Sequence, residues 1–221
     1  MSRETSALNT AQITYLAFAA IMATWIGAWL LKINLEQDLS WLTAGLGSFV
    51  YWTAAKLIIW IVPAVWLLRK AGRSFREVFG LANWPAWAAW GGGIGLLIAL
   101  TGIIPNLLQG KAVLPTRLDF ALLNVLVIAP TFEELLMRGA IQGNLTECYS
   151  LAKANVITSL MFVLLHVPGW YFMGVLTQNL TNPAGGALSI FLVSLRFGYA
   201  AHRSRSVMGG VLAHFLNNRK R

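Results

Sequence analysis

Residues 130–139 read Pro-Thr-Phe-Glu-Glu-Leu-Leu-Met-Arg-Gly, and they place three charged side chains inside a long apolar segment. That segment opens near Phe120 and closes near Leu145. A charge near the centre of a bilayer costs about 2.5–3.5 kcal/mol on insertion scales, so such residues usually have partners inside the protein or a function. The stretch therefore predicts a membrane helix that carries a polar site.

The composition of the whole chain favours a membrane protein. Of 221 residues, 57% are hydrophobic and 11% are charged, whereas soluble domains carry about 25% charged residues. The mean hydropathy is +0.63, and ten tryptophans are typical of aromatic belts at lipid interfaces. Because only helices and closed barrels satisfy backbone groups in lipid, we predict an all-α fold, a polytopic transmembrane bundle of about six to eight helices.

Apolar segments of about 20 residues are long enough to cross a bilayer. The sequence predicts six or seven crossings, drawn from residues 12–31, 47–68, 85–108, 119–145, 151–166 and 185–201 and the short terminal segment 207–218. A break is expected at Pro168-Gly169, before a second apolar piece at 170–180. The small residues at 91–95 are expected to let two helices approach closely.

The net charge of +9 comes from basic residues in short loops. These residues are Arg69, Lys70, Arg73 and Arg76, then Arg203 and Arg205, and finally Arg219, Lys220 and Arg221. Short basic loops are typical of the cytoplasmic side of membrane proteins. We therefore expect a multi-pass protein of the cell membrane with a cytoplasmic N-terminus, not a nucleic-acid-binding protein. The polar stretch 69–83 could hold a short amphipathic surface helix.

Helical geometry pairs some of the polar residues. Residues four apart on a helix lie about 40° from each other, so Glu134 and Arg138 can form an ion pair, which often serves as a structural clamp. Glu133 points about 140° away from Arg138, and it is left without a cation on its own helix. His214 and Asn218 share a face by the same spacing and could project into one cavity.

His166 ends the fifth apolar segment. A lone histidine on an apolar helix more often makes an interhelical hydrogen bond than takes part in catalysis. However, Glu133, two histidines and an asparagine from three apolar segments could together form an acid–base site. Lys56 and Arg196 also lie within apolar spans, and we interpret them as bundle packing or as side chains that snorkel to the interface.

Three motifs in the second half of the chain resemble those of the CPBP family, the CAAX proteases and bacteriocin-processing enzymes, also called the Abi family. The family includes the type II CAAX prenyl endopeptidases. Its motifs are EExxxR, FxxxH and HxxxN, and here they read EELLMR at 133–138, FVLLH at 162–166 and HFLNN at 214–218. All three occur in the family's order and inside apolar segments.

The resemblance implies an intramembrane endopeptidase of the glutamate type. Glu133 would be the general base, and His166 would help to hold and deprotonate the attacking water. His214 and Asn218 would donate hydrogen bonds to the developing oxyanion, a contact often worth about 3–4 kcal/mol in the transition state. The substrate would be a membrane-associated peptide or protein: a prenylated C-terminus, a bacteriocin leader or a sorting tail.

In the same family pattern, Glu134 and Arg138 would brace the helix. The chain would be a single integral membrane domain over 1–221, with variable leading spans at 1–118 and the catalytic core at 119–218. No cofactor is expected, and the partners would be the substrate and the lipid bilayer, not nucleic acid.

Two other interpretations remain open from the residues. In the first, Glu133, His166 and His214 bind zinc as three ligands, with water in the fourth position, although the chain lacks the HExxH spacing of many zinc proteases. In the second, the protein is a transporter or scaffold, since transporters also keep intramembrane carboxylates. No inverted repeat, which many transporters show, is visible in the sequence.

Overall fold

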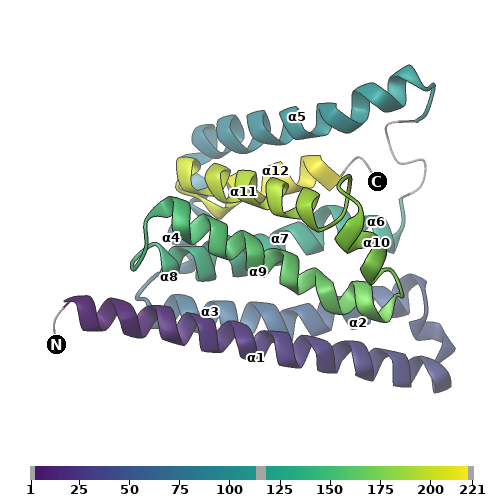
Figure 1. The fold of residues 1–221 in the computed structure, drawn as a ribbon, viewed down its shortest axis with the longest axis horizontal. Coiled ribbons are helices and arrows are strands. Elements are labelled where there is room, and N and C mark those ends of the chain that lie inside the picture. The colour runs from purple at the N-terminus through teal and green to yellow at the C-terminus, as the bar shows by residue number, and fades with distance from the viewer. Residues whose placement is uncertain (1–2, 113–117, 219–221) are drawn as a thin grey trace.

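The chain folds into a bundle of helices, as predicted. A computed structural model describes residues 3–112 and 118–218, with side chains from Asn9 onward, and no β-strand occurs in those ranges. The α-helices are α1 (Arg3–Asp38), α2 (Gly45–Lys56), α3 (Val62–Lys70), α4 (Phe75–Phe79), α5 (Trp84–Leu108), α6 (Phe120–Leu123), α7 (Ala129–Glu134), α8 (Gly143–Leu145), α9 (Leu151–Phe172), α10 (Leu176–Thr181), α11 (Ala187–Ser204) and α12 (Val207–Asn218) (Figure 1).

Short π-helical segments join several of these helices into continuous rods. Leu57–Ile61 connects α2 to α3, Asn124–Ile128 connects α6 to α7, and Leu135–Gln142 connects α7 to α8. Such widened turns are rare and often occur at functional sites. The long segment that carries both glutamates therefore changes its helical pitch immediately after Glu134.

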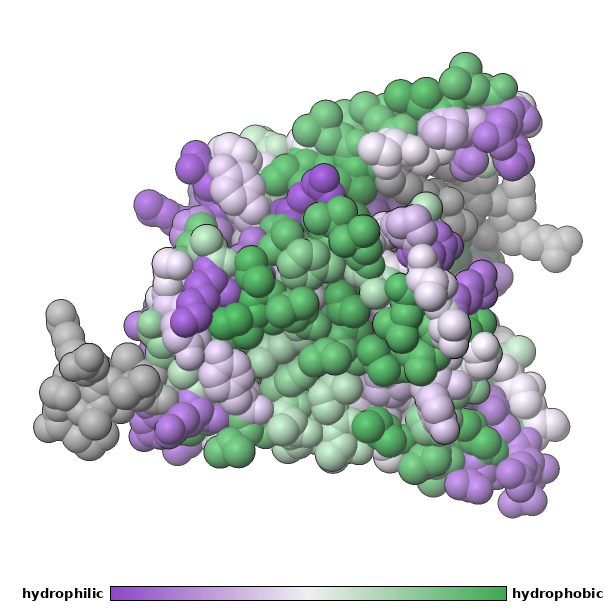
Figure 2. All heavy atoms as spheres, in the orientation of Figure 1, coloured by the Kyte–Doolittle hydropathy of each residue, from purple (hydrophilic) through white to green (hydrophobic). Residues whose placement is uncertain are grey.

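Five helical stretches in the described residues are long and apolar enough to cross a membrane. They are Asn9–Asp38, Gly45–Lys70, Phe75–Leu108, Phe120–Leu145 and Leu151–Phe172. The predicted span 185–201 forms α11, which carries Arg196, His202 and Arg203 and is not one of these five stretches. In Figure 2, hydrophobic side chains cover the middle of the visible face, and hydrophilic side chains gather toward its two ends. These features make the chain an integral membrane protein.

The predicted break at Pro168-Gly169 is wrong, because α9 continues through both residues to Phe172. Gly169 serves close packing instead, since a Cβ there would lie 3.0 Å from the indole ring of Trp29. The helix ends one turn later, where Gly174 adopts a left-handed φ of 70° and donates its N–H to the Tyr171 carbonyl. A glycine in this conformation is a common helix terminator.

The predicted basic loops lie at one end of the bundle. The side chain of Arg73 donates to the carbonyls of Gly139 and Ala140, and Asn83 donates to the Ser204 carbonyl over 2.6 Å. The predicted surface helix is α4, which begins with a capping box between Ser74 and Glu77. The basic triplet 219–221 lies outside the described residues.

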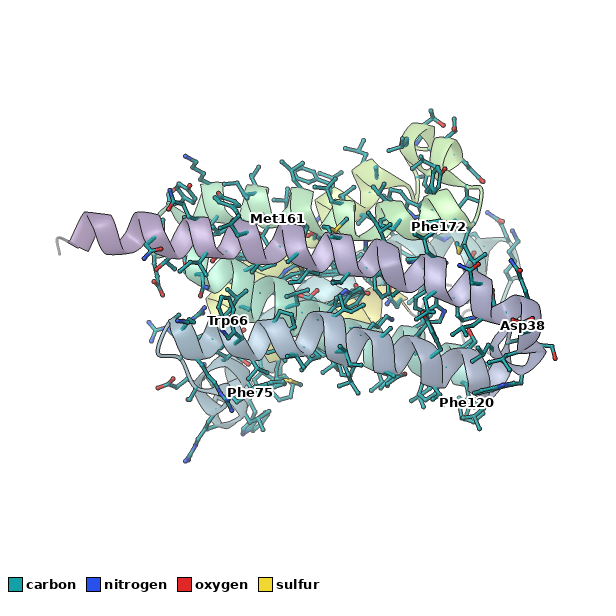
Figure 3. All side chains as sticks on the ribbon, turned by 90° about the horizontal axis from the view of Figure 1, so that it is seen from below. Asp38, Trp66, Phe75, Phe120, Met161 and Phe172 are labelled. Atoms are coloured by element: carbon teal, nitrogen blue, oxygen red, sulfur yellow. The ribbon has the colours of Figure 1, made fainter. Side chains whose placement is uncertain are left out.

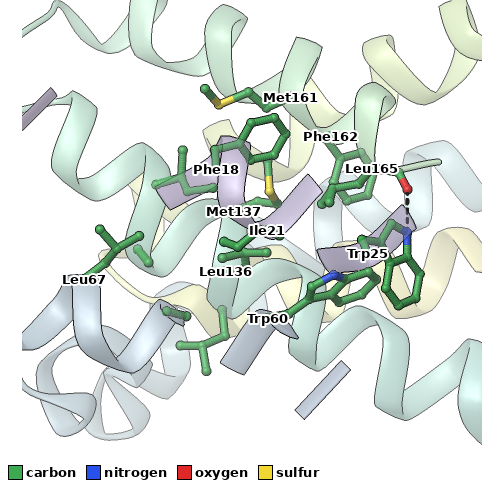
Figure 4. Packing of buried hydrophobic residues seen from close by; sticks show 14 of the residues in the cluster. Phe18, Ile21, Trp25, Trp60, Leu67, Leu136, Met137, Met161, Phe162 and Leu165 are labelled. Atoms are coloured by element: carbon green, nitrogen blue, oxygen red, sulfur yellow. Dashed lines mark hydrogen bonds between the residues drawn. The ribbon is translucent and has the colours of Figure 1, made fainter. Parts of the chain in front are cut away.

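Helix α1 covers the seam between two other parts of the bundle. Seen from below, it runs between Met161 and Phe172 of α9 on one side and Trp66 of α3 on the other (Figure 3). Figure 4 shows the core under this seam, where the Trp25 indole N–H donates to the Leu165 carbonyl over 3.1 Å. The leading helices therefore pack directly on the helix that carries His166.

Several tryptophans lie inside the bundle, whereas Trp41, Trp66 and Trp84 are exposed, as residues of an aromatic belt would be. Trp25, Trp60 and Trp170 are buried. The ring centroids of Trp25 and Trp60 are 4.6 Å apart, and those of Trp29 and Trp52 are 4.4 Å apart. These rings therefore pack against each other instead of meeting lipid headgroups.

Helix α12 lies against α5, and small residues on both helices allow this contact. A Cβ at Gly91 would lie 2.5 Å from the Gly209 carbonyl, and one at Gly95 would lie 2.9 Å from the Ala213 Cα. The prediction that the glycines at 91–95 permit close helix approach is confirmed. The contact holds α12, and with it His214, in the interior of the bundle.

Candidate active site

Both motif glutamates are buried at the end of α7. Glu133 is 8% exposed and Glu134 is fully buried. The Arg138 Nε lies 3.1 Å from the Glu134 Oε2, so the predicted ion pair is confirmed. Arg138 also donates to the carbonyl and hydroxyl oxygens of Ser194 on α11, each over 2.7 Å. A buried charge needs such partners, and here they link the glutamate segment to α11.

His214 of α12 lies between the two glutamates. Its Nδ1 is 3.1 Å from the Glu134 Oε1, and its Nε2 is 3.9 Å from the Glu133 Oε2. The imidazole also stacks on the ring of Phe197, with centroids 4.6 Å apart. An ionised carboxylate can only accept, so Nδ1 donates to Glu134. This bond orients the ring and turns Nε2 toward Glu133.

His166 of α9 is oriented by its own helix. Its Nδ1 lies 2.8 Å from the Phe162 carbonyl, and a carbonyl can only accept a hydrogen bond. Nδ1 therefore carries the hydrogen, and Nε2 of the neutral ring is an acceptor. The aromatic ring of Phe162 packs edge-on against both His166 and His214, so the first residue of the FxxxH motif separates and supports the two histidines.

Glu133 and His166 line the same cavity. The cavity has a volume of about 300 Å³. Its lining consists of Trp25, Trp29, Trp52, Lys56, Trp60, Asn124, Glu133, Leu165, His166, Gly169, Trp170 and Met173. The arrangement puts one carboxylate and one imidazole in a space with mainly aromatic and apolar walls.

Asn218 lies at the end of α12, on the same side as His214. Its side-chain nitrogen donates to the Val125 carbonyl over 2.9 Å. Neither His214 nor Asn218 is among the described residues that line the cavity of Glu133 and His166. The structure therefore brings His214 to both glutamates, but it connects Asn218 to the π-helical segment Asn124–Ile128.

One family model matches the chain, and it covers the motifs. The model for type II CAAX prenyl endopeptidase Rce1-like proteins matches residues 115–219, which include all three motifs. This match supports the resemblance of the second half of the chain to the CPBP family of CAAX proteases. No curated protein and no solved structure matches the chain.

The family match supports a CAAX-type intramembrane protease in general terms. The interpretation of the glutamates as part of a transporter or scaffold is therefore not needed. Residues 1–114 lie outside the match. They nevertheless supply five of the residues around the cavity, namely Trp25, Trp29, Trp52, Lys56 and Trp60.

Two polar residues that line the cavity, Lys56 and Asn124, belong to none of the three motifs. Lys56 is buried, and its Nζ lies 3.2 Å from the Asn124 Oδ1. Of the two interpretations given for Lys56, bundle packing is the one that the structure shows, and snorkelling to the interface is not. Arg196, which received the same interpretation, is exposed and donates to the Leu192 carbonyl of its own helix. The sequence signal for the contact between Lys56 and Asn124 was that a lysine and an asparagine each lie within an apolar span.

The bond from His214 to Glu134 was also missed. The sequence assigned Glu134 wholly to Arg138, because residues four apart are neighbours on one helix. The partner that sequence reasoning missed comes from α12, 80 positions along the chain. Glu134 therefore joins Arg138 to His214 and has more than a bracing role.

The structure does not group the ligands that the zinc interpretation requires. Among the described residues, no three His, Cys, Asp or Glu side chains are placed together to hold a metal ion. His214 faces the glutamates, whereas His166 opens on the cavity. The donor set Glu133, His166 and His214 thus does not fit a three-ligand zinc site.

Proposed function

We propose that this CAAX-type protease is a glutamate-type intramembrane endopeptidase of the cell membrane. It hydrolyses a peptide bond of a membrane-associated protein or peptide, without a metal or other cofactor. The observation that carries the proposal is that Glu133 and His166, from different helices, line one cavity with mainly apolar walls. A carboxylate and an imidazole in such a space are suited to general acid–base chemistry.

Glu133 is the general base. Arg138, the cation of its own segment, is paired with Glu134, so Glu133 remains available to accept a proton. His166 presents Nε2 as an acceptor because Nδ1 donates to the Phe162 carbonyl. A water held between the two side chains loses a proton to Glu133 while its oxygen attacks the carbonyl carbon of the scissile bond.

His214 and Asn218 stabilise the oxyanion that this attack creates. His214 is held at Nδ1 by Glu134, and its Nε2 is farther from Glu133 than a hydrogen bond allows. Nε2 can therefore donate to substrate when the ring is protonated. The side-chain amide of Asn218 carries two hydrogens. It donates one to the Val125 carbonyl and the other to the oxyanion.

Collapse of the tetrahedral intermediate completes the reaction. The carbon–nitrogen bond breaks, and the proton that Glu133 took from water passes to the leaving amine. The carbonyl side of the cleaved bond leaves as a carboxylic acid, which gives its proton to the new amine or to water and becomes a carboxylate. The substrate classes that fit are those with an extended, membrane-anchored segment: a prenylated C-terminus, a bacteriocin leader or a sorting tail.

The experiment is peptide cleavage by the protein reconstituted in liposomes, followed by mass spectrometry. The probes are apolar 20-residue peptides with and without a farnesylated cysteine. Wild-type protein and Glu147→Gln, the same change at an exposed loop position, are expected to cleave, and Glu133→Gln is not. Cleavage by Glu133→Gln at the wild-type rate would refute the role of Glu133. Failure of the wild-type protein to cleave any probe would count against the endopeptidase assignment.

A further inference from the structure

Lys56 places a positive charge in the proposed catalytic cavity. It ends α2, it is 7% exposed, and it lines the same cavity as Glu133 and His166. It lies outside the segment 115–219 that matches the family model. Lys56 therefore belongs to none of the three family motifs.

The ammonium group of Lys56 has only a neutral hydrogen-bond partner among the described residues. That partner is the Asn124 Oδ1, at 3.2 Å. Glu133 attracts the ammonium across the cavity, but no carboxylate of a described residue lies within ion-pair distance of Nζ. An ammonium has three donors. A buried cation is costly unless it is paired, so the site has the chemistry to receive an anion.

The walls around Lys56 are aromatic. Its Nζ lies 5.4 Å from the centroid of the Trp60 ring. Trp60 packs on Trp25, and Trp25 packs on Trp52, with centroids 5.3 Å apart in the second pair. Each of these three rings therefore packs against another. A cavity of about 300 Å³ with such walls suits a short apolar segment.

We propose that Lys56 is a substrate-binding residue, which pairs with a carboxylate of the peptide while the tryptophans hold an adjacent apolar side chain. The inference rests on the proposed function, since the cavity is that of Glu133. An extended residue spans about 3.3–3.6 Å, so the carboxylate lies within a few residues of the scissile bond. It belongs either to the end of the peptide chain or to an Asp or Glu side chain.

Two pairs of peptides test the proposal and separate these sources. One pair differs only in a free or amidated C-terminus, and the other differs only in Asp or Asn next to the cleavage site. The wild-type protein is expected to cleave the charged member of one pair with a kcat/KM about 10- to 100-fold higher, as for a charge-assisted hydrogen bond. No preference in either pair overturns the proposal without touching the endopeptidase assignment.

Variants locate the preference. Lys56→Met is expected to cleave both members of the pair at the rate of the neutral one, through a change in KM. Lys153→Met, the same change at an exposed position, retains the wild-type preference. A Lys56→Met protein that keeps the preference, or that loses activity equally for both peptides, contradicts a carboxylate-binding role. If the Lys56→Met protein aggregates, the same measurements are made with Lys56→Gln.

Binding gives a readout that does not require cleavage. The affinity of the same peptides for Glu133→Gln protein is measured by tryptophan fluorescence, because five tryptophans line the cavity. The charged peptide is expected to bind with a Kd about 10- to 100-fold lower, and Lys56→Met in the same background removes the difference. Equal Kd values for both peptides in Glu133→Gln protein would overturn the proposal, whether or not the wild-type protein is an endopeptidase.

Discussion

The Nδ1 atom of His214 lies 3.1 Å from the Glu134 carboxylate, although 80 positions separate the two residues in the chain. The same carboxylate pairs with Arg138 over 3.1 Å. Glu134 thus connects the arginine, which holds α11, to the histidine of α12. The second glutamate of the motif therefore links α11 and α12, and the catalytic role that we propose belongs to the first.

Removal of the Glu134 charge should weaken the whole bundle. In Glu134→Gln, Arg138 keeps its charge in a buried position without a carboxylate, and breaking a buried pair in this way costs about 3–5 kcal/mol. The free energy of unfolding in detergent micelles measures this cost. Glu147→Gln, at an exposed position, should change it by less than about 0.5 kcal/mol. Equal stability of the two variants would show that Glu134 is not a structural centre.

Gly210 should be sensitive to a single added methyl group. A Cβ there would lie 2.6 Å from the Glu134 Oε2, so Gly210→Ala displaces the carboxylate that orients His214. Cleavage is expected to fall at least tenfold, about the effect of 1.4 kcal/mol. Gly93→Ala is the matched control, because a Cβ at Gly93 meets no atom within 4 Å. Wild-type cleavage by Gly210→Ala would mean that Glu134 does not position His214.

Asn218 should contribute to turnover more than to binding. Loss of one oxyanion donor typically lowers kcat by about 100- to 1,000-fold, so Asn218→Ala is expected to show this loss with a nearly unchanged KM. Asn34→Ala, at an exposed position of α1, should behave as wild type. A rise in KM with an unchanged kcat would instead indicate that the bond to Val125 only holds the helices together.

Activity should not depend on a metal ion. The described residues contain no group of three ligands placed to hold one. Protein that is treated with a chelator, and then freed of the chelator, is expected to cleave peptide at the untreated rate. Elemental analysis of this protein should find less than about 0.1 zinc per chain, whereas an occupied three-ligand site would hold one. Loss of cleavage on chelation, restored by zinc alone, would favour the metalloprotease interpretation.

The parts of the site that follow from local geometry could be predicted from sequence. Glu134 and Arg138 are four residues apart, and helix periodicity alone places them on one face. The five apolar stretches are equally local features. The separation of Glu133 from Arg138 also followed from spacing, and it directed attention to residues on other helices.

Other parts depended on contacts between distant segments. The bond from His214 to Glu134 requires the position of α12 against α7, which no spacing within one helix reveals. Pro168 predicted a break, but the packing of Gly169 on Trp29 stabilises a continuous α9. Lys56 carried no motif, and only the fold places it in the cavity with Glu133.

The central claim is that Glu133 and His166 activate one water in one cavity. The most direct measurement is the single-turnover rate of peptide cleavage by wild type, Glu133→Gln, His166→Ala and the double variant. Each single change is expected to lower the rate by about 100- to 10,000-fold, and the double change should lower it little further, because groups that act as a unit are not additive. A wild-type rate in Glu133→Gln, or fully multiplicative losses in the double variant, would contradict the account.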